Sequence, residues 1–175
     1  QNLPPEWLHF LLPSRYCQSD ELSALARSIV GEMWPDYRQV AAIQRWVREN
    51  LQYESGSSNS CTTALETLNT RRGVCRDFAH LAIALCRAIN IPARMVVGFL
   101  HELEPMDLHA WFEAYIGGRW FTFDATQWVT SGNRIVVAYG RDAADVALAT
   151  MFGGFTLSNM HVQVTNADEQ PLFCG

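Results

Sequence analysis

The feature of this sequence that most constrains its fold is a change in the period of its apolar residues near residue 92. Before that point, apolar side chains recur at the spacing of amphipathic helices. After it, β-branched and aromatic residues gather in short runs typical of strands. The predicted helices span 19–31, 36–50 and 75–89, with Ser19 as the cap of the first. A capping box at 63–66 predicts a further short helix. The predicted strands span 94–100, 109–116, 119–124, 134–139 and 159–165. Helices followed by antiparallel strands predict an α+β domain, with residues 1–18 irregular.

A Gly117-Gly118 pair between two strand patterns predicts a tight β-hairpin. With a two-residue turn, Trp111 lies opposite Asp124, and His109 is on the same face, diagonal to Asp124. We therefore expect the His109 imidazole to hydrogen-bond the Asp124 carboxylate, which fixes one tautomer and leaves the other ring nitrogen to act as a base. The residues alone leave a second interpretation open, a partly buried histidine with an unrelated aspartate nearby.

Cys75 follows a turn expected at residues 71–73 and opens the most apolar of the predicted helices. The backbone N–H groups and the dipole at a helix N-terminus favour an anion, so a thiol there should ionise more readily. A cysteine can equally be a small buried apolar residue, which is the role expected of Cys86 in the middle of the same helix. Cys75, His109 and Asp124 would together supply a nucleophile, a base and an orienting acid for acyl transfer through a thioester.

Several segments resemble bacterial transglutaminase-like proteins of the papain-like cysteine protease superfamily. They are Gly73-Val-Cys-Arg-Asp-Phe-Ala-His-Leu81, Ile91-Pro-Ala-Arg94, Asp107-Leu-His-Ala-Trp-Phe-Glu113, Trp120-Phe-Thr-Phe-Asp-Ala-Thr126 and residues 134–146, and the similarity runs from about Tyr16 to Thr165. The resemblance implies catalytic roles for Cys75, His109 and Asp124 and a papain-like layout, with the cysteine helix packed on an antiparallel sheet. It also implies that residues 1–175 form one catalytic core domain of a longer chain, and that a small β-domain can precede it.

Two positions qualify the resemblance. The residue after the cysteine is often glutamine in this group, and here it is Arg76, which could lower the pKa of the thiol, bind an acidic substrate group, or simply face solvent. An oxyanion hole needs donors aimed at the developing charge, and the backbone N–H of Cys75 is a natural one. Tyr53 is a candidate for the second donor, with a place in the core as the alternative.

Composition excludes several other classes of function. A net charge of −5 argues against a nucleic-acid or anionic-membrane role, and no run of apolar residues is long enough to span a bilayer. The five cysteines include no Cys-x-x-Cys pair, so we expect neither a metal site nor another cofactor, and a reducing, cytoplasmic setting. The expected partner is a peptide or protein substrate. Hydrolysis of an amide is the favoured reaction, with amine transfer by a transglutaminase and a non-catalytic binding module as the alternatives.

Overall fold

The computed structural model describes residues 3–101, 103–128, 133–147 and 162–165. Four α-helices precede the main strands: α1 (Ser23–Val30), α2 (Tyr37–Asn50), α3 (Ala64–Thr70) and α4 (Cys75–Ala88). The main sheet has four antiparallel strands in the order β5-β4-β3-β6, formed by β3 (Ala93–Leu100), β4 (His109–Ile116), β5 (Arg119–Phe123) and β6 (Arg134–Gly140). This arrangement confirms the predicted α+β domain with antiparallel strands.

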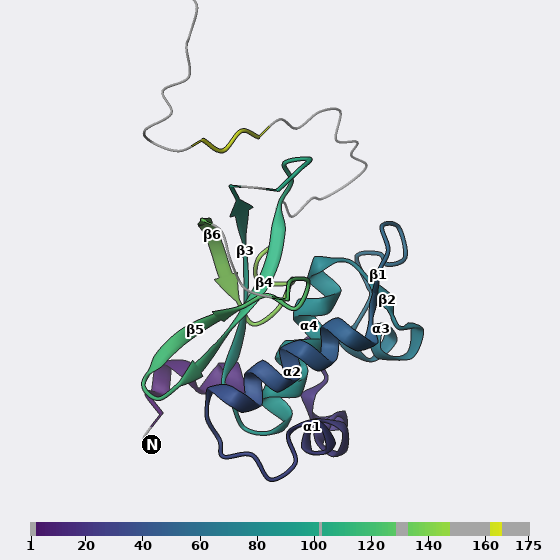
Figure 1. Cartoon of the computed structure of the whole chain (residues 1–175). Helices are drawn as coiled ribbons and strands as arrows, with labels where there is room; N and C mark the ends of the chain where they lie inside the picture. Colours follow the sequence, from purple (N-terminus) through teal and green to yellow (C-terminus); the bar gives the residue numbers. More distant parts are fainter. Residues whose placement is uncertain (1–2, 102, 129–132, 148–161, 166–175) are drawn as a thin grey trace, which may run out of the picture.

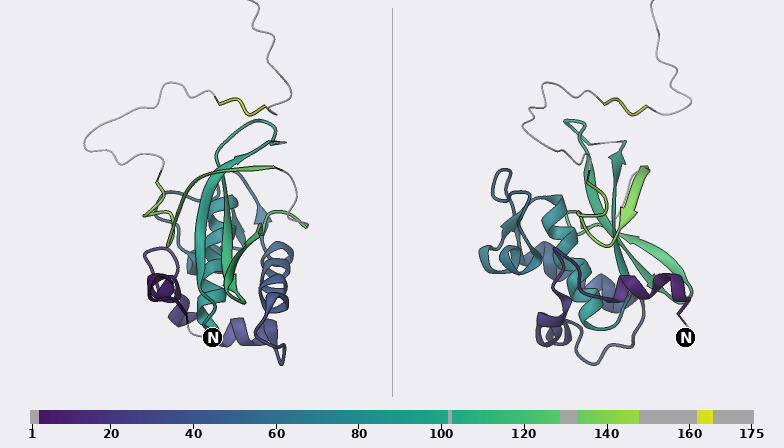
Figure 2. Two further views of the ribbon diagram at one scale, coloured as in Figure 1. Left: turned by 90° about the vertical axis from the view of Figure 1, so that its left-hand side faces the viewer. Right: turned by 180° about the vertical axis from the view of Figure 1, so that it is seen from behind.

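The helices lie together on one side of the main sheet, with α4 against it (Figures 1 and 2). Alanines at 79, 82 and 84 favour a helix at α4, and Phe78, Leu81 and Leu85 on this helix are buried. They join one apolar core with inward residues of the strands, among them Met95 and Phe112. The buried length of α4 therefore fixes its first residue, Cys75, at one end of the sheet.

The hairpin between β4 and β5 has the predicted form. Gly117 and Gly118 both have positive φ, 61° and 91°, as a two-residue type I′ turn requires. The register pairs Ile116 with Arg119 and Phe112 with Phe123, and one further step sets Trp111 opposite Asp124. The observed pairing therefore confirms that His109 and Asp124 lie on the same face of the hairpin.

Four local predictions were wrong or only partly testable. Residues 5–11 form a 3-10 helix, η1 (Pro5–Leu11), because Trp7 and Phe10 pack on Trp120 of the hairpin. Ser19 begins a separate 3-10 turn, η2 (Ser19–Glu21), and gives α1 no side-chain cap. Residues 71–73 are not simply a turn, since β2 (Arg72–Gly73) pairs in parallel with β1 (Gln52–Tyr53). Residues 162–165 are not a strand, and 159–161 lie outside the described residues.

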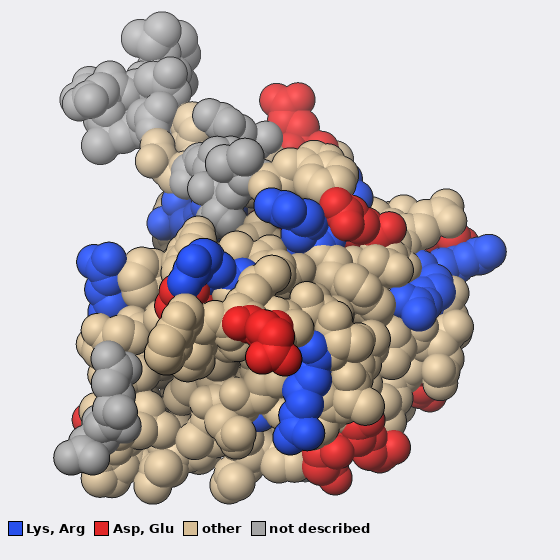
Figure 3. Space-filling view, turned by 60° about the horizontal axis from the view of Figure 1, so that its bottom comes forward, with Lys and Arg blue, Asp and Glu red and all other residues tan. Residues whose placement is uncertain are grey.

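The described helices include none that is long and apolar enough to cross a bilayer. On the face shown in Figure 3, acidic and basic side chains are interspersed among uncharged ones, without a broad basic area. This distribution agrees with the net charge of −5 and offers no surface suited to a polyanion on that face.

Candidate active site

Cys75 is placed by the two-stranded β1–β2 sheet as well as by its helix. The backbone N–H of Glu54 donates to the Gly73 carbonyl at 3.0 Å, which ties the strand before Cys75 to the strand that carries Tyr53. A Cβ at position 73 would lie 2.7 Å from the Cβ of Asp77, so only glycine fits there. Tyr53 is consequently held beside the first turn of α4.

The first turn of α4 is closed by Asp77, a residue to which the sequence interpretation gave no role. Its buried carboxylate accepts a hydrogen bond from the Val74 N–H at 2.9 Å and another from the Ser58 hydroxyl. The Arg76 guanidinium does not simply face solvent, because it pairs with Asp77 at 2.9 Å and donates to the Asn59 carbonyl at 2.7 Å. Arg76 thus fastens the polar loop after β1 to the helix that carries Cys75.

The structure brings His109 and Asp124 into contact. The Nε2 of His109 lies 2.8 Å from Oδ2 of Asp124, and the exposed fractions of the two residues are 6% and 0%. Burial lowers the pKa of His109, but the hydrogen bond to Asp124 and the interaction with Cys75 outweigh it and raise that pKa to about 9. Burial also opposes ionisation of Asp124, yet the hydrogen bonds from His109 and Thr126 bring its pKa below the usual value. The imidazole is therefore a cation at neutral pH, facing a carboxylate.

Asp124 is held by further residues that the sequence interpretation missed. The Thr126 backbone N–H and hydroxyl donate to its Oδ1 at 3.0 and 2.7 Å, and Arg134 donates to its Oδ2 at 3.3 Å. The Gln44 amide of α2 donates to the Asp124 carbonyl at 3.0 Å. The contact of Thr126 could have been predicted locally, because an aspartate side chain commonly accepts hydrogen bonds from the residue two positions later in a turn. The contacts of Arg134 and Gln44 could not have been predicted in this way, because only the folded chain brings these residues to Asp124.

Cys75 lies between His109 and Tyr53. Cys75 and His109 line the same cavity, and their interaction helps to raise the pKa of His109. Tyr53 also interacts with the side chain and the backbone of Cys75. Burial and the neighbouring Cys75 raise the pKa of Tyr53, so the phenol keeps its proton. The buried Trp111 ring stacks on His109 with ring centres 6.2 Å apart, which shields that face of the imidazole from water. Cys75 and the paired His109 and Asp124 thus belong to one site.

The other described cysteines differ from Cys75 in their surroundings. Cys17 and Cys86 are buried, and burial raises the pKa of Cys17 to about 12 and also raises that of Cys86. Cys61 is exposed, and Cys174 lies outside the described residues. Cys86 is therefore the buried apolar cysteine that its position predicted.

Alkylation is expected to distinguish these thiols. At pH 7, Cys75 should react with iodoacetamide about 10-fold or more faster than Cys61, although Cys61 is more exposed, because the N-terminus of α4 and the His109 imidazole lie beside the Cys75 sulfur and Cys61 has no such neighbours in the described structure. Cys86 should react only on unfolding. Peptide mapping by mass spectrometry over a time course measures each site. Equal rates at Cys75 and Cys61 would contradict an activated nucleophile.

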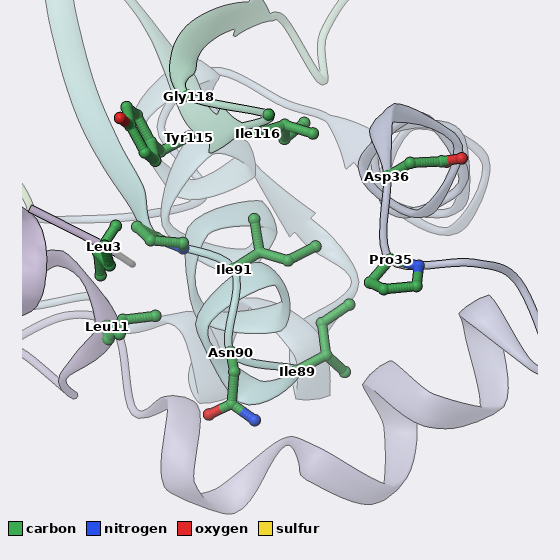
Figure 4. Close-up of a pocket in the computed structure, with 12 residues that line it drawn as sticks. Leu3, Leu11, Pro35, Asp36, Ile89, Asn90, Ile91, Tyr115, Ile116 and Gly118 are labelled. Carbon is green, nitrogen blue, oxygen red and sulfur yellow. The ribbon is translucent and has the colours of Figure 1, made fainter. Parts of the chain in front are cut away.

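A cavity of about 690 Å³ lies at the end of α4 away from Cys75 and is shown in Figure 4. Leu3 and Leu11 face it from one side, Ile91 from its centre and Pro35 from the other side. Among its described lining residues, Asp36 is the one ionisable group other than tyrosine, and that carboxylate is paired with Arg38 at 2.7 Å. These described residues include no cysteine, serine, threonine or histidine, so Cys75 remains the candidate nucleophile. Nowhere in the described part of the chain do three or more His, Cys, Asp or Glu side chains gather as metal ligands would.

A helix that presents a cysteine at its first turn, packed on an antiparallel sheet that presents a paired histidine and aspartate, defines a papain-like domain. The sequence profile of the Transglutaminase-like superfamily matches residues 23–125, and the chain belongs to that superfamily. The predicted membership and the predicted papain-like fold are both confirmed.

Relatives agree with this assignment. The chain is similar to a "Putative Cysteine Protease" of Cytophaga hutchinsonii, whose crystal structure matches with 52% identity and a TM-score of 0.89 over 93% of this chain and 56% of that one. The periplasmic domain of TgpA from Pseudomonas aeruginosa matches with 26% identity and a TM-score of 0.57, over 74% of this chain and 51% of that one. An uncharacterized protein of Mycobacterium leprae is 32% identical over 164 residues, which are 88% of this chain and 58% of that protein. The chain thus spans little more than half the length of these relatives.

Proposed function

We propose that this domain hydrolyses amide bonds of a peptide or protein substrate through a thioester on Cys75. The observation that carries the proposal is that Cys75 lines one cavity with His109, whose imidazole is bound to the Asp124 carboxylate at 2.8 Å. A thiol, an imidazole and a carboxylate in that order are the groups that nucleophilic acyl transfer uses. The likeness to the C. hutchinsonii protein, named as a cysteine protease, favours the same chemistry.

The proposed reaction has two halves. In the first, the Cys75 thiolate attacks the amide carbonyl, His109 gives its proton to the leaving amine, and a thioester remains. In the second, His109 takes a proton from water, the resulting hydroxide attacks the thioester, and the Cys75 thiolate leaves with a carboxylic acid as product. Asp124 holds the imidazole by its Nε2 throughout, so Nδ1 is the nitrogen left to exchange protons with Cys75 and the substrate.

Tyr53 and the Cys75 backbone N–H are the proposed donors to the oxyanion. The Tyr53 hydroxyl interacts with both the side chain and the backbone of Cys75, so the oxygen of a carbonyl bonded to that sulfur would lie close to both donors. The raised pKa of Tyr53 keeps its hydroxyl protonated and able to donate. The strand pairing of Tyr53 with Gly73 holds this donor in place before substrate arrives, which is the requirement for electrostatic stabilisation of a transition state.

Replacement of Tyr53 by phenylalanine is therefore expected to lower kcat by about 10²-fold, the usual effect of removing one oxyanion donor. Tyr37→Phe is the matched control, because Tyr37 is exposed to a similar degree, 48% against 52%, and packs on Phe123 away from Cys75. Steady-state kinetics on a cleaved peptide measure both variants. An unchanged kcat in Tyr53→Phe would remove Tyr53 from the oxyanion hole and leave it as a packing residue beside Phe78.

Amine transfer shares the first half-reaction, so only the fate of the thioester separates it from hydrolysis. The test is to incubate the protein with glutamine-containing peptides and a labelled primary amine, and to identify products by mass spectrometry. The chain contains no lysine, so it offers no lysine amine of its own and the added label is the acceptor to follow. Shortened peptides or free carboxylates support hydrolysis, incorporated amine supports transfer, and the absence of any acyl-enzyme or product supports a non-catalytic binding module.

The compartment in which the protein works remains a prediction. We propose a reducing, cytoplasm-like setting, because the four described cysteines are all free thiols, as is usual in such a compartment.

A further inference from the structure

A cavity of about 300 Å³ opens directly beside the proposed nucleophile, and both Cys75 and His109 line it. Met95 and Val97 of β3 and Leu108, just before β4, form part of its lining. Ala143 and Val146, from the turn that follows β6, also line it. Its volume is at the small end of the range for ligand-binding sites. A group bonded to the Cys75 sulfur would have this apolar space next to it.

The charged groups around this cavity are already paired. Arg76 and His109 are the only Arg, Lys, His, Asp or Glu side chains among its described lining residues. The Arg76 guanidinium is bound to Asp77 and to the Asn59 carbonyl, and His109 is bound to Asp124. A charged substrate side chain that entered would lose its water without gaining an unpaired counter-ion among these residues, which is costly.

The wall formed by residues 141–147 is anchored at several points. The Ala143 backbone N–H donates to Nε2 of buried His80 on α4 at 3.1 Å, and the Arg141 carbonyl accepts from Arg87 at 2.6 Å. Asp142 accepts from the Tyr16 backbone N–H at 2.9 Å. Burial lowers the pKa of His80 to about 4, which leaves its Nε2 free to accept at neutral pH. The cavity is thus largely shaped before any substrate binds.

We propose that this cavity receives an uncharged, apolar side chain of moderate size from the residue at or next to the acyl carbonyl of the substrate. The proposal rests on the proposed function, since it assigns the cavity to the acyl donor of that reaction. It makes aliphatic residues the preferred substrates over acidic, basic or amide side chains. Specificity then comes from apolar contact and from the cost of stripping water from a polar group.

The test uses peptide chloromethyl ketones, which report on binding at the cavity without requiring turnover. The Cys75 thiolate displaces chloride and forms a carbon–sulfur bond to the methylene group. Reagents of the form acetyl-X-Gly and acetyl-Gly-X chloromethyl ketone, with X as Val, Leu, Phe, Gln, Glu or Arg, sample both positions. We expect Val or Leu to inactivate about 10-fold or more faster than Gln, Glu or Arg at one position, a ratio within the range set by apolar contacts.

Two substitutions then link that preference to the cavity. Ala143→Leu fills it and should lower the rate with the Leu reagent about 10-fold while leaving the iodoacetamide rate at Cys75 unchanged. Ala144→Leu is the matched control, because Ala144 is exposed and is not among the lining residues. Leu108→Ala, at a half-buried position, enlarges the cavity and should favour a Phe reagent over the Val reagent, which provides a second route if Ala143→Leu does not fold.

The outcomes separate this proposal from the proposed function. Equal rates for all reagents, or faster reaction with Gln, Glu or Arg, would overturn the apolar cavity while peptide hydrolysis could still stand. A clear preference for Val or Leu that is lost in Ala143→Leu, in a protein that never turns over a peptide, would support the cavity and count against hydrolysis.

Discussion

Cys75→Ala is expected to lower kcat/KM for peptide hydrolysis by about 10⁴-fold or more, since the thioester cannot form without the sulfur. The fold should survive the change, because Cys75 is only half-buried and alanine suits the first turn of a helix. The expected change in the free energy of unfolding is within about 1 kcal/mol. Peptide cleavage rates and chemical denaturation measure the two effects separately.

Cys86→Ala is the matched control for this result, because Cys86 lies on the same helix and is fully buried. It should keep full activity and lose about 1 kcal/mol of stability through the small cavity it leaves. The two variants should therefore differ in opposite ways. Cys75→Ala should lose activity and keep its stability, whereas Cys86→Ala should keep its activity and lose stability. If Cys75→Ala retained more than about a tenth of the activity, nucleophilic catalysis by this residue would be excluded.

The parts of the fold that could be predicted are those fixed by local chemistry. The ends of α2 and α4 and the turn between β4 and β5 agree with the prediction because a capping aspartate, a proline and two glycines act over a few residues. The parts that could not be predicted depend on distant partners. Residues 5–11 are helical only where Trp7 meets Trp120, and β1 and β2 are too short to show a strand pattern without each other.

In the candidate site, too, some contacts could be predicted from local sequence and others depend on residues far apart in the chain. Residue parity across a hairpin brings His109 to Asp124, so that contact followed from counting along two strands. Helix chemistry likewise placed Cys75 at the start of α4. Arg134 reaches Asp124 from β6, and Arg76 binds a loop some 17 residues earlier, so neither contact has a local signal. The residues that hold Asp124 and the first turn of α4 were therefore missed, whereas Cys75, His109 and Asp124 were named as candidates from the sequence.

Asp124→Asn is expected to lower kcat/KM by about 10² to 10⁴-fold, because an amide cannot stabilise the His109 cation and can favour the wrong tautomer. The wild-type pH profile of kcat/KM should fall above about pH 9, where the raised pKa of His109 lies. In the variant, loss of the Asp124 charge and hydrogen bond lowers that pKa, so the alkaline limb should move toward neutral pH. Arg134→Gln is the control, since it removes a second partner of Asp124 and leaves the imidazole–carboxylate pair intact.

Stability should respond to pH through the same pair. The pKa of His109 is raised on folding, so its contribution is fully present below the unfolded value of about 6.5 and is lost as pH rises through about 9. The pKa of Asp124 is lowered, so its contribution is present above the unfolded value and is lost as pH falls through the folded one. Urea denaturation of the wild type should therefore show up to about 3 kcal/mol less stability at pH 9.5 than at pH 6.5. Arg134→Gln should keep this slope and Asp124→Asn should flatten it, whereas an equal slope in all three proteins would mean that His109 is not held as a cation by Asp124.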